Sequence, residues 1–331
     1  MATSSLAPDE GLAARLASAE TAVPEPLRAV LRGVGQVFFQ GSALSGACFV
    51  AGIAANSPLM AVGGLAGSAI GLAVARLAKF DPDEIADGIY GFNPALVGVA
   101  SFFFFKPGAA AVLLMVVGCV AATFVTRLMR KGLPFPTYTT PFIVTTWLLW
   151  LVGPSLGAQS VAPGEAPSVV NAFAAAANGV GQVMFQANML TALLFVLGIA
   201  LGDWRHAVLV VVGSALGVLA ANYHVTPEQR ALDPERMAQR FLPENIGLGL
   251  YSYNATLAAV ALFLSRRSLA RALLGVLLSV PLTELVPKLG LPALTAPFVL
   301  ATWLVLILAW FDATFLNRAP TTATPSHDAA G

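Results

Sequence analysis

The chain has 331 residues, of which 57% are hydrophobic and only 11% are charged. Soluble domains carry about 25% charged residues, so this chain could not cover itself with charge in water, and we predict an integral membrane protein. The net charge is +1 and no segment forms a concentrated basic face, which argues against nucleic acid as a partner.

The two ends of the chain are polar. Residues 1–27 are alanine-rich and lack a basic-then-apolar cleavage pattern, so we expect a cytoplasmic N-terminal segment and no removable signal peptide. Residues 313–331 are predicted to be a cytoplasmic disordered tail, because the stretch from Ala319 is rich in Thr, Pro and Ala. Cys48 and Cys119 lie inside apolar runs, so no disulfide is expected.

Ten apolar stretches lie between these ends, each close to the ~20 residues that a spanning helix needs. The first repeat, residues 28–153, holds stretches near 37–55, 58–77, 88–105, 108–126 and 138–153. An external linker at 154–173 leads to the second repeat, residues 174–312, with stretches near 183–202, 204–222, 246–264, 269–286 and 294–312. Prolines interrupt several stretches, which lipid tolerates where freed backbone groups find partners or line a cavity: Pro94, Pro141, Pro281 and Pro297.

The basic residues predict how these spans are oriented. With the N-terminus in the cytoplasm, only five of the 18 lysines and arginines fall outside: Lys106, Arg230, Arg236, Arg240 and Lys288. The linker between the repeats contains neither residue type. This positive-inside bias predicts a multi-pass protein of the cell membrane (inner or plasma membrane) with both termini cytoplasmic.

Three motifs occur twice and in the same order. GVGQVFFQ at 33–40 returns as GVGQVMFQ at 179–186, GIYGFNPAL at 88–96 as GLYSYNATL at 249–257, and FPTYTTPF at 135–142 as LPALTAPF at 291–298. The unequal offsets of 146, 161 and 156 residues indicate an insertion before the second middle motif, within the polar stretch around 223–245. The recurrence predicts a duplicated unit. Because five spans is an odd number, the second copy must be inverted in the membrane, so matching motifs face each other near the midplane.

The polar groups predicted inside the membrane do not ionise. Asp203, Glu244 and Glu284 fall at predicted span ends, and no histidine lies deep. Placing a charged side chain at the centre of a spanning helix costs at least ~2.5–3.5 kcal/mol, and proteins usually accept this cost for a proton relay or an ion site. The absence of such a charge favours passive conduction of a neutral solute. Amide and hydroxyl lone pairs could replace the hydration of a solute rich in N–H donors: Gln36, Gln40, Asn93, Thr139, Gln182, Gln186, Asn254 and Thr295. Aromatic rings beside them could form a flat slot: Phe39, Phe92, Phe142, Phe185, Tyr253 and Phe298.

The paired motifs FPxxTxPF and LPxxTxPF, together with GIYGFN and GLYSYN, resemble those of the urea transporter family and its bacterial urea channels, from about Arg28 to Trp310. The resemblance implies a trimer of independent pores that pass urea by facilitated diffusion. It also implies a short re-entrant helix over 28–40 and another over 174–186. The predicted fold is an all-α integral membrane protein with ten transmembrane helices and two re-entrant half-helices, in two inverted five-span repeats.

The resemblance also assigns pore residues. The midpoint hydroxyls fall on Thr139 and Thr295, and the slot walls on Phe92 with Leu96 and on Tyr253 with Leu257. The mouth residues fall on Gln36, Phe39, Gln182 and Phe185. Three positions depart from the family pattern: Tyr253 replaces Phe, Ser252 replaces the Gly found at Gly91, and Phe135 replaces Leu. The implied partners are urea, close analogues and membrane lipid in a homotrimer, with no cofactor, metal or catalytic residue.

Simpler roles remain open for the same residues. Thr139 and Thr295 could bond the carbonyl four residues earlier in their own helices. Gln36 and Gln182 could cap re-entrant helices, and Phe92 and Tyr253 could be core. The rings at 102–105 are predicted to face lipid or another subunit, and the acidic residues at 81–87 to form a solvated inner loop.

Other functions fit the sequence less well. Asn93-Pro94-Ala95 spells the tripeptide of water and glycerol channels, but its counterpart is Asn254-Ala255-Thr256 and ten spans exceed that six-span fold. An ammonium channel would need paired buried histidines, and a receptor or scaffold would not need two sets of midplane acceptors. An enzyme is disfavoured because no nucleophile–base pair, metal cluster or phosphate loop occurs. A channel for another small neutral solute (water, a short amide or ammonia) remains the alternative.

Overall fold

The computed structural model describes residues 8–162, 171–232 and 244–316. These residues form helices and turns, and their single β-type pairing is a bridge between Phe105 and Ser160. The predicted disordered tail from Ala319, part of the linker, and the basic residues Arg236 and Arg240 lie outside the described residues.

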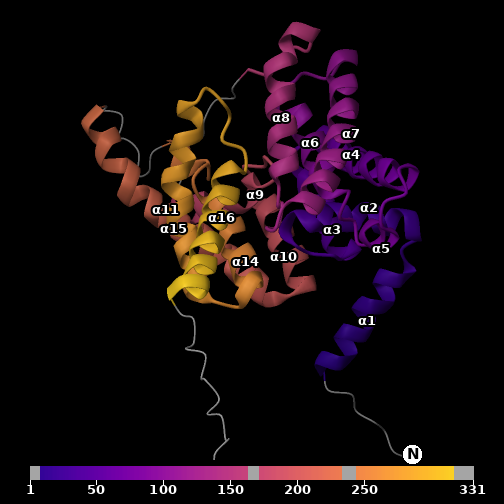
Figure 1. Cartoon of the computed structure of the whole chain (residues 1–331), viewed down its shortest axis with the longest axis horizontal. Helices are drawn as coiled ribbons and strands as arrows, with labels where there is room; N and C mark the ends of the chain where they lie inside the picture. Colours follow the sequence, from indigo (N-terminus) through magenta and orange to yellow (C-terminus); the bar gives the residue numbers. More distant parts are fainter. Residues whose placement is uncertain (1–7, 163–170, 233–243, 317–331) are drawn as a thin grey trace, which may run out of the picture.

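The first half of the chain contains α1 (Pro8–Ala22), α2 (Glu25–Gly35), η1 (Gln36–Phe38), α3 (Ala43–Asn56), α4 (Pro58–Leu77), α5 (Pro82–Ala86), α6 (Phe92–Phe104), α7 (Ala109–Gly132), α8 (Thr140–Val152) and η2 (Pro154–Leu156). The second half contains α9 (Ala172–Gln182), α10 (Met189–Gly202), α11 (Trp204–Leu232), α13 (Glu244–Gly247), α14 (Ser252–Arg266), α15 (Leu269–Lys288) and α16 (Ala296–Phe311). From α2 to α8, the helices of the first half match α9 to α16 in order. Figure 1 shows the two halves side by side, with the first half in indigo to magenta and the second in salmon to yellow.

The chain end differs from the prediction of a disordered tail beginning at residue 313. A π-helical turn at Asp312–Leu316 continues from α16, so residues 313–316 are helical. In Figure 1, α1 and the C-terminal end of α16 both lie at the lower end of the molecule.

Several helices are long and apolar enough to cross a membrane. They are α4, α7, Trp204–His224 within α11, α15 and Ala296–Leu316, and Glu25–Phe38 with Ala43–Asn56 forms a further candidate bent by 75°. Three more apolar helices, α6, α8 and α10, are shorter. The protein is therefore a multi-pass helical membrane protein.

The short helices begin later than predicted because each repeated motif contains a left-handed turn. Positive φ values occur at equivalent positions of the two copies: Phe39 (60°) and Phe185 (63°), Gly88 (77°) and Gly249 (79°), Tyr138 (46°) and Leu294 (46°). A residue with positive φ cannot continue a right-handed helix. The predicted stretches that began at 37, 88, 183 and 246 therefore contain a turn near their start, and their main helices begin at 43, 92, 189 and 252.

Two of the interrupting prolines have a different role from the one predicted. Pro141 and Pro297 occupy the first turn of α8 and α16, where a missing N–H costs no helical hydrogen bond. They start these helices and do not break them. Pro281 lies inside α15, as predicted.

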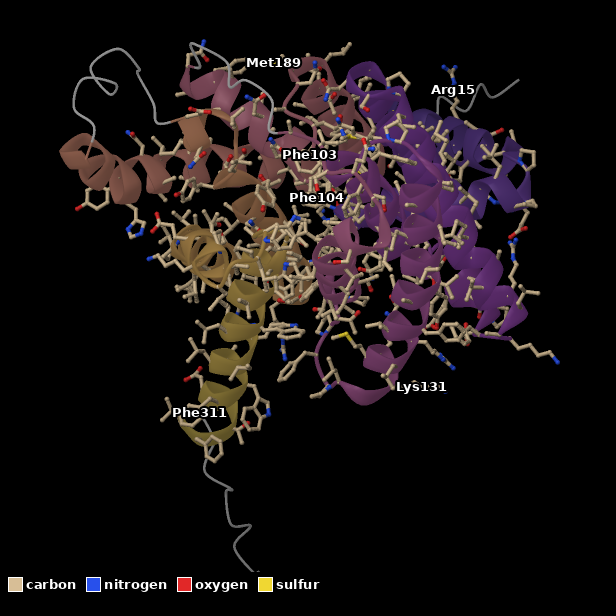
Figure 2. The ribbon with its side chains drawn as sticks, turned by 90° about the horizontal axis from the view of Figure 1, so that it is seen from above. Arg15, Phe103, Phe104, Lys131, Met189 and Phe311 are labelled. Atoms are coloured by element: carbon tan, nitrogen blue, oxygen red, sulfur yellow. The ribbon has the colours of Figure 1, made fainter. Side chains whose placement is uncertain are left out.

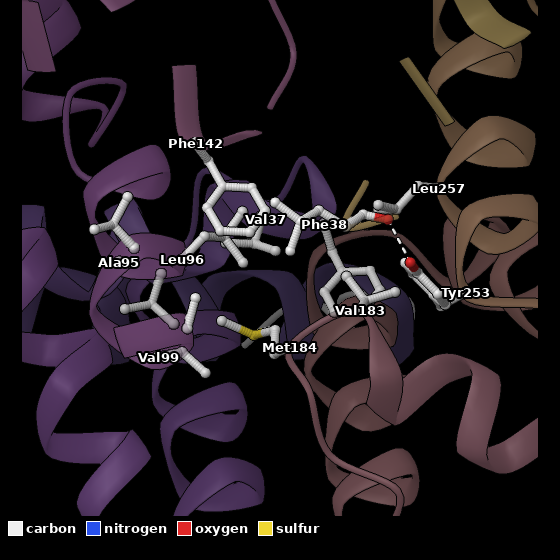
Figure 3. Packing of buried hydrophobic residues seen from close by; sticks show 14 of the residues in the cluster. Val37, Phe38, Ala95, Leu96, Val99, Phe142, Val183, Met184, Tyr253 and Leu257 are labelled. Carbon is white, nitrogen blue, oxygen red and sulfur yellow. Dashed lines mark hydrogen bonds between the residues drawn. The ribbon is translucent and has the colours of Figure 1, made fainter. Parts of the chain in front are cut away.

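The two halves meet at α3 and α10 around a cluster of buried rings. Phe38 lies 5.2 Å from Phe49 and 5.5 Å from Phe195, measured between ring centroids, and Phe49 lies 5.3 Å from Phe195. Figure 3 shows Phe38 of the first half beside Val183 of the second. Dense packing across this junction holds the repeated motifs of the two halves at fixed positions.

Helix α1 is attached to the body by one carboxylate. Glu20 accepts hydrogen bonds from the backbone N–H groups of Ala43 (2.9 Å) and Leu44 (3.2 Å) at the start of α3, and from the Arg32 guanidinium (2.9 Å). Burial alone would raise the pKa of Glu20, but these bonds lower it below its ordinary value.

Candidate functional site

The two threonines of the third motif meet at the centre of the molecule. Thr139 and Thr295 each precede the first turn of their helix, with nearly identical backbone angles (φ −93°, ψ 13° and φ −94°, ψ 16°). Their hydroxyl oxygens lie 2.7 Å apart in a hydrogen bond, and both residues are buried. The motifs that lie 156 residues apart in the sequence are therefore in contact.

Five other buried threonines behave as isolated helical threonines usually do. Their hydroxyls donate to the carbonyl four residues earlier in the same helix: Thr123, Thr126, Thr256, Thr283 and Thr302. The same arrangement was an open interpretation of Thr139 and Thr295, and the structure excludes it for this pair.

Two asparagines of the second motif position the threonines. Oδ1 of Asn93 accepts from the backbone N–H of Phe142 (3.1 Å), and Oδ1 of Asn254 accepts from that of Phe298 (3.0 Å). Each bond satisfies an N–H in the first turn of a helix that otherwise has no partner. The prediction that these amides offer oxygens to a solute is wrong, because those oxygens already serve as helix caps.

Gln40 and Gln186 also serve the fold. Each side-chain amide donates to the carbonyl two residues earlier, at 2.9 Å to Phe38 and 2.8 Å to Met184. These bonds close the left-handed turns that follow α2 and α9. Of the eight amide and hydroxyl groups considered, the hydroxyls of Thr139 and Thr295 are the two that bond each other.

Two tryptophans tie the halves together around the threonines. The indole N–H of Trp147 on α8 donates to the carbonyl of Pro292 (2.9 Å), and that of Trp303 on α16 donates to the carbonyl of Pro136 (2.9 Å). Each helix thus holds the third motif of the opposite half. The reciprocal pair is what a two-fold relation between the halves requires.

A cavity of about 610 Å³ reaches the threonine pair from one side. Its wall includes Thr295, Leu294 and Tyr253 near the pair, and Glu284 and Lys288 of α15. Four of the predicted pore residues line it: Gln182, Phe185, Tyr253 and Thr295. Thr139 joins this group through its bond to Thr295.

Phe185 is the centre of an aromatic wall in this cavity. Its ring centroid lies 4.7 Å from that of Phe103, 6.0 Å from Phe104 and 6.3 Å from Phe142. Figure 2 places Phe103 and Phe104 where the two halves join. Both rings line the cavity, a position that the sequence prediction of lipid-facing or intersubunit rings did not include, and Phe103 is also exposed. The sequence signal was their position at the end of α6, the helix that begins with the second motif.

An equivalent arrangement surrounds Phe39 in the other half. Its ring centroid lies 6.4 Å from Phe298, matching the 6.3 Å between Phe185 and Phe142, and 6.2 Å from Tyr138. In each half, the ring at the seventh position of the first motif therefore approaches the Pro-Phe ring of the other half. This places aromatic surface on both sides of the threonine pair.

The remaining predicted residues lie in other surroundings. Leu96 and Leu257 are fully buried in the main core, and Phe92 packs partly buried against it. The side-chain amide of Gln36 donates to the carbonyl of Asp87 (3.0 Å), which ties α2 to the loop after α5.

Comparison with known proteins decides the family. The sequence profile of the family described as "UT: Urea transporter" matches residues 27–233 and 236–310. The chain belongs to the urea transporter family. It is 26% identical to "Urea transporter 1" of Ovis aries over 306 residues, which covers 84% of this chain and 76% of that protein. It is 27% identical to "Urea transporter 1" of Rattus norvegicus over 308 residues, with the same coverage.

One side chain breaks the symmetry of the site in this member of the urea transporter family. The hydroxyl of Tyr253 donates to the carbonyl of Leu294, the residue before Thr295. In the first half the matching side chain is Phe92, which has no hydroxyl to donate, and the Asn93 amide lies 3.4 Å from the carbonyl of Tyr138. Asn254 approaches the Leu294 carbonyl at the same distance, 3.4 Å.

The second motif of each half also contains a tyrosine bonded to a glutamate. Tyr251 donates to Glu284 (3.2 Å), whose other oxygen lies 3.8 Å from His224. Tyr90 donates to Glu84 (2.5 Å), and Arg130 pairs with the same carboxylate. Burial would raise the pKa of Glu84, but the bonds from Tyr90 and Arg130 lower it. The sequence analysis interpreted residues 81–87 as a solvated inner loop, because Arg130, the partner of Glu84, lies 46 residues further along the chain.

Proposed function

We propose that each chain forms an uncoupled pore for urea, with its narrowest point at Thr139 and Thr295. The observation that carries this proposal is the hydrogen bond between two equivalent hydroxyls at the inner end of a cavity. Membership of the urea transporter family supports urea as the solute. In the proposed arrangement the cell-membrane protein is a homotrimer, and each protomer has its own pore.

The proposed topology has two inverted five-span repeats, residues 28–153 and 174–312, with both termini in the cytoplasm. It counts ten spans, and α2 and α9 serve as the two re-entrant half-helices. Three observations support it: the matched order of helices, the reciprocal tryptophan bonds, and the 75° bend between α2 with η1 and α3.

Urea would enter the pore through a change of hydrogen-bond partners. At the narrowest point a urea N–H donates to each threonine oxygen while the bond between the two hydroxyls opens. One bond in the protein is exchanged for bonds to the solute, so the net cost of opening is small. Rings flanking the pair, Phe39 with Phe298 and Phe185 with Phe142, favour a flat solute and exclude its hydration shell.

The proposed pore has no coupling device at its centre. Threonine hydroxyls do not ionise at physiological pH, and the charged groups in the cavity wall, Glu284 and Lys288, are on α15. Leu96 and Leu257 support the aromatic slot from the core in this proposal, with Gln36 and Gln182 at its two mouths. The Asn93-Pro94-Ala95 tripeptide gives little support to the water-channel alternative, because the Asn93 side chain accepts from the backbone N–H of Phe142 and caps α8.

Stopped-flow light scattering on proteoliposomes tests this function. We expect rapid urea entry that saturates only at high concentration and is the same with and without proton or sodium gradients. Uptake that requires either gradient would reject the uncoupled pore. Parallel measurements with methylurea, glycerol, water and ammonia test the alternative solutes, and a pore that passes one of these but not urea would overturn the assignment.

A further inference from the structure

A second cavity, of about 540 Å³, lies between the start of α11 and the end of α14. It shares no lining residue with the cavity that reaches the threonines. Its wall contains two arginines, a histidine, an aspartate and two apolar side chains: Arg205, Arg267, His206, Asp203, Phe263 and Leu264. Transport through the proposed pore requires none of these groups.

The cavity carries an excess of positive charge. Neither Arg205 nor Arg267 forms an ion pair with a residue of the described segments. Asp203 is the acidic residue in the wall, and its oxygens face other groups: one accepts the backbone N–H of Arg205 (2.8 Å) and the other lies 3.8 Å from Nε2 of His206. Two guanidinium groups therefore remain available to an anion.

The floor of the cavity is held by a hydrogen-bonded chain. The side-chain amide of Gln40 donates to the carbonyl of Phe38 and lies 3.2 Å from Nδ1 of His206. With Nδ1 as the acceptor, Nε2 carries the hydrogen and faces Asp203. The imidazole is mostly buried, so this edge of the cavity is fixed by the buried junction of the halves.

The remaining lining is apolar and continues into surface that is suited to lipid. Leu264 is exposed, as are Leu269 and Leu273 of the adjoining α15. The Arg205 guanidinium lies 5.8 Å from the ring of Trp204, an exposed aromatic side chain of the kind found at membrane interfaces. A water-soluble anion would have no use for these apolar neighbours.

We propose that this cavity binds the phosphate of an acidic phospholipid headgroup. Arg205 and Arg267 would bind the phosphate oxygens, which match the planar guanidinium fork. Phe263 and Leu264 would contact the start of the acyl chains. The distribution of basic residues predicts that these arginines lie on the cytoplasmic side, where the leaflet is negatively charged and basic pockets between helices bind lipid headgroups.

Native mass spectrometry and thermal unfolding of the detergent-purified protein test the proposal. The probes are a short-chain phosphatidylglycerol, the matching phosphatidylcholine, and inorganic phosphate. The test variant combines Arg205→Gln with Arg267→Gln. The matched control is Arg271→Gln, which changes an arginine of α15 outside the cavity wall.

We expect phosphatidylglycerol to bind the wild type and raise its unfolding temperature, since a ligand that binds only the folded state stabilises it. Two lost arginine contacts correspond to a roughly thirtyfold weaker affinity in the double variant, from ~1 kcal/mol per contact. The control should bind like the wild type, and urea flux in phosphatidylcholine vesicles should be the same for all three proteins. That flux shows whether the double variant is folded.

Three outcomes would overturn the proposal. Equal binding of phosphatidylglycerol and phosphatidylcholine would remove the role of charge. Binding of inorganic phosphate without phosphatidylglycerol would assign the cavity to a soluble anion. Undiminished lipid binding by a double variant with normal urea flux would place the lipid elsewhere.

Discussion

Thr139 and Thr295 differ in their hydrogen-bond partner from the five buried threonines that bond a carbonyl of their own helix. Both lie before a helix and not inside one, so no carbonyl of an earlier turn of the same helix is available to them. The left-handed residues Tyr138 and Leu294 turn the chain immediately before them. Local sequence therefore predicted two matching hydroxyls, but their contact depends on how two distant segments pack.

Replacing Thr295 by Val should slow urea flux by roughly fivefold, because a hydrogen bond lost in the proposed constriction is worth about 1 kcal/mol. Thr139→Val should have a similar effect. The control is Thr302→Val, which removes an equally buried hydroxyl of α16 that bonds the Phe298 carbonyl. If stopped-flow rates fall equally for Thr295 and Thr302, or for neither, the hydroxyl pair has no special role in transport.

The hydroxyl of Tyr253 occupies a carbonyl beside the constriction, and Tyr253→Phe would release it. The Leu294 carbonyl would then keep only the long 3.4 Å contact with the Asn254 amide among the described residues, and a more available acceptor favours solutes with more N–H donors. The ratio of urea to methylurea flux should therefore rise by about threefold. Tyr251→Phe is the control, because its hydroxyl bonds Glu284 away from the threonines. An unchanged flux ratio for Tyr253→Phe would show that the Leu294 carbonyl does not contact the solute.

Sequence reasoning at this scale failed where a side chain has a partner far along the chain. Asn93 was considered a solute ligand because its amide lies in an apolar stretch, but its partner Phe142 is 49 residues away. Phe103 was considered lipid-facing because it belongs to a run of rings at a span end. In both cases the role of the side chain depends on which other helix packs against it, and the hydrophobic pattern of the sequence does not show which helices are neighbours.

Hydrophobic periodicity was most reliable for helices without a motif. The stretch at 58–77 matches α4, and that at 269–286 matches α15 to within two residues. The stretches that contain motifs were too long at their N-terminal ends, since apolar residues such as Phe39 occupy left-handed turns where glycine is usual. Composition identifies what lies in the membrane, but not where the backbone leaves the helix.

Gly249 shows how tightly these turns approach neighbouring helices. It has a φ of 79°, and a Cβ there would lie 2.4 Å from the backbone nitrogen of Gly179. Gly249→Ala should therefore destabilise the protein by about 2–4 kcal/mol, combining backbone strain and overpacking. Gly290 has a similar φ of 74° with open space around it, so Gly290→Ala should cost only about 1 kcal/mol. Thermal unfolding of the two purified variants checks this order.

The attachment of α1 should depend on pH. The folded pKa of Glu20 is lowered, so its contribution is complete above the ordinary glutamate value of about 4.3 and is lost as the pH falls through the folded pKa. Glu20→Gln should release α1 at neutral pH. Limited proteolysis of α1 measures this, with Glu25→Gln as the control, because Glu25 forms an exposed pair with Arg76. Equal protection of α1 in Glu20→Gln and wild type would refute the carboxylate's role.

At the scale of the whole molecule, duplication was the most informative property of the sequence. Three motifs that recur in order predicted that matching segments meet, and the threonine contact and the reciprocal Trp147 and Trp303 bonds agree with that prediction. The sequence also shows where the two halves differ, but it does not show what each difference does to the structure. Tyr253 in place of Phe acquires its meaning only when the Leu294 carbonyl is found beside it.

Transport by the whole molecule should be electrically silent. Urea is neutral, and the two residues in contact at the proposed constriction carry hydroxyl groups that do not ionise at physiological pH. Planar bilayers containing the protein should carry no current under a urea gradient and an applied voltage. A current that scales with the amount of protein would indicate ion passage.

The bond between Thr139 and Thr295 also determines the state of the proposed constriction between the passage of one solute molecule and the next. The two hydroxyl oxygens lie 2.7 Å apart, so no water molecule fits between them while the bond is formed. Without a continuous chain of hydrogen-bonded water through the pore, protons cannot be transferred from one water molecule to the next across it. A cell could then keep many such pores permanently in place and still hold the electrochemical potential that drives its ATP synthesis.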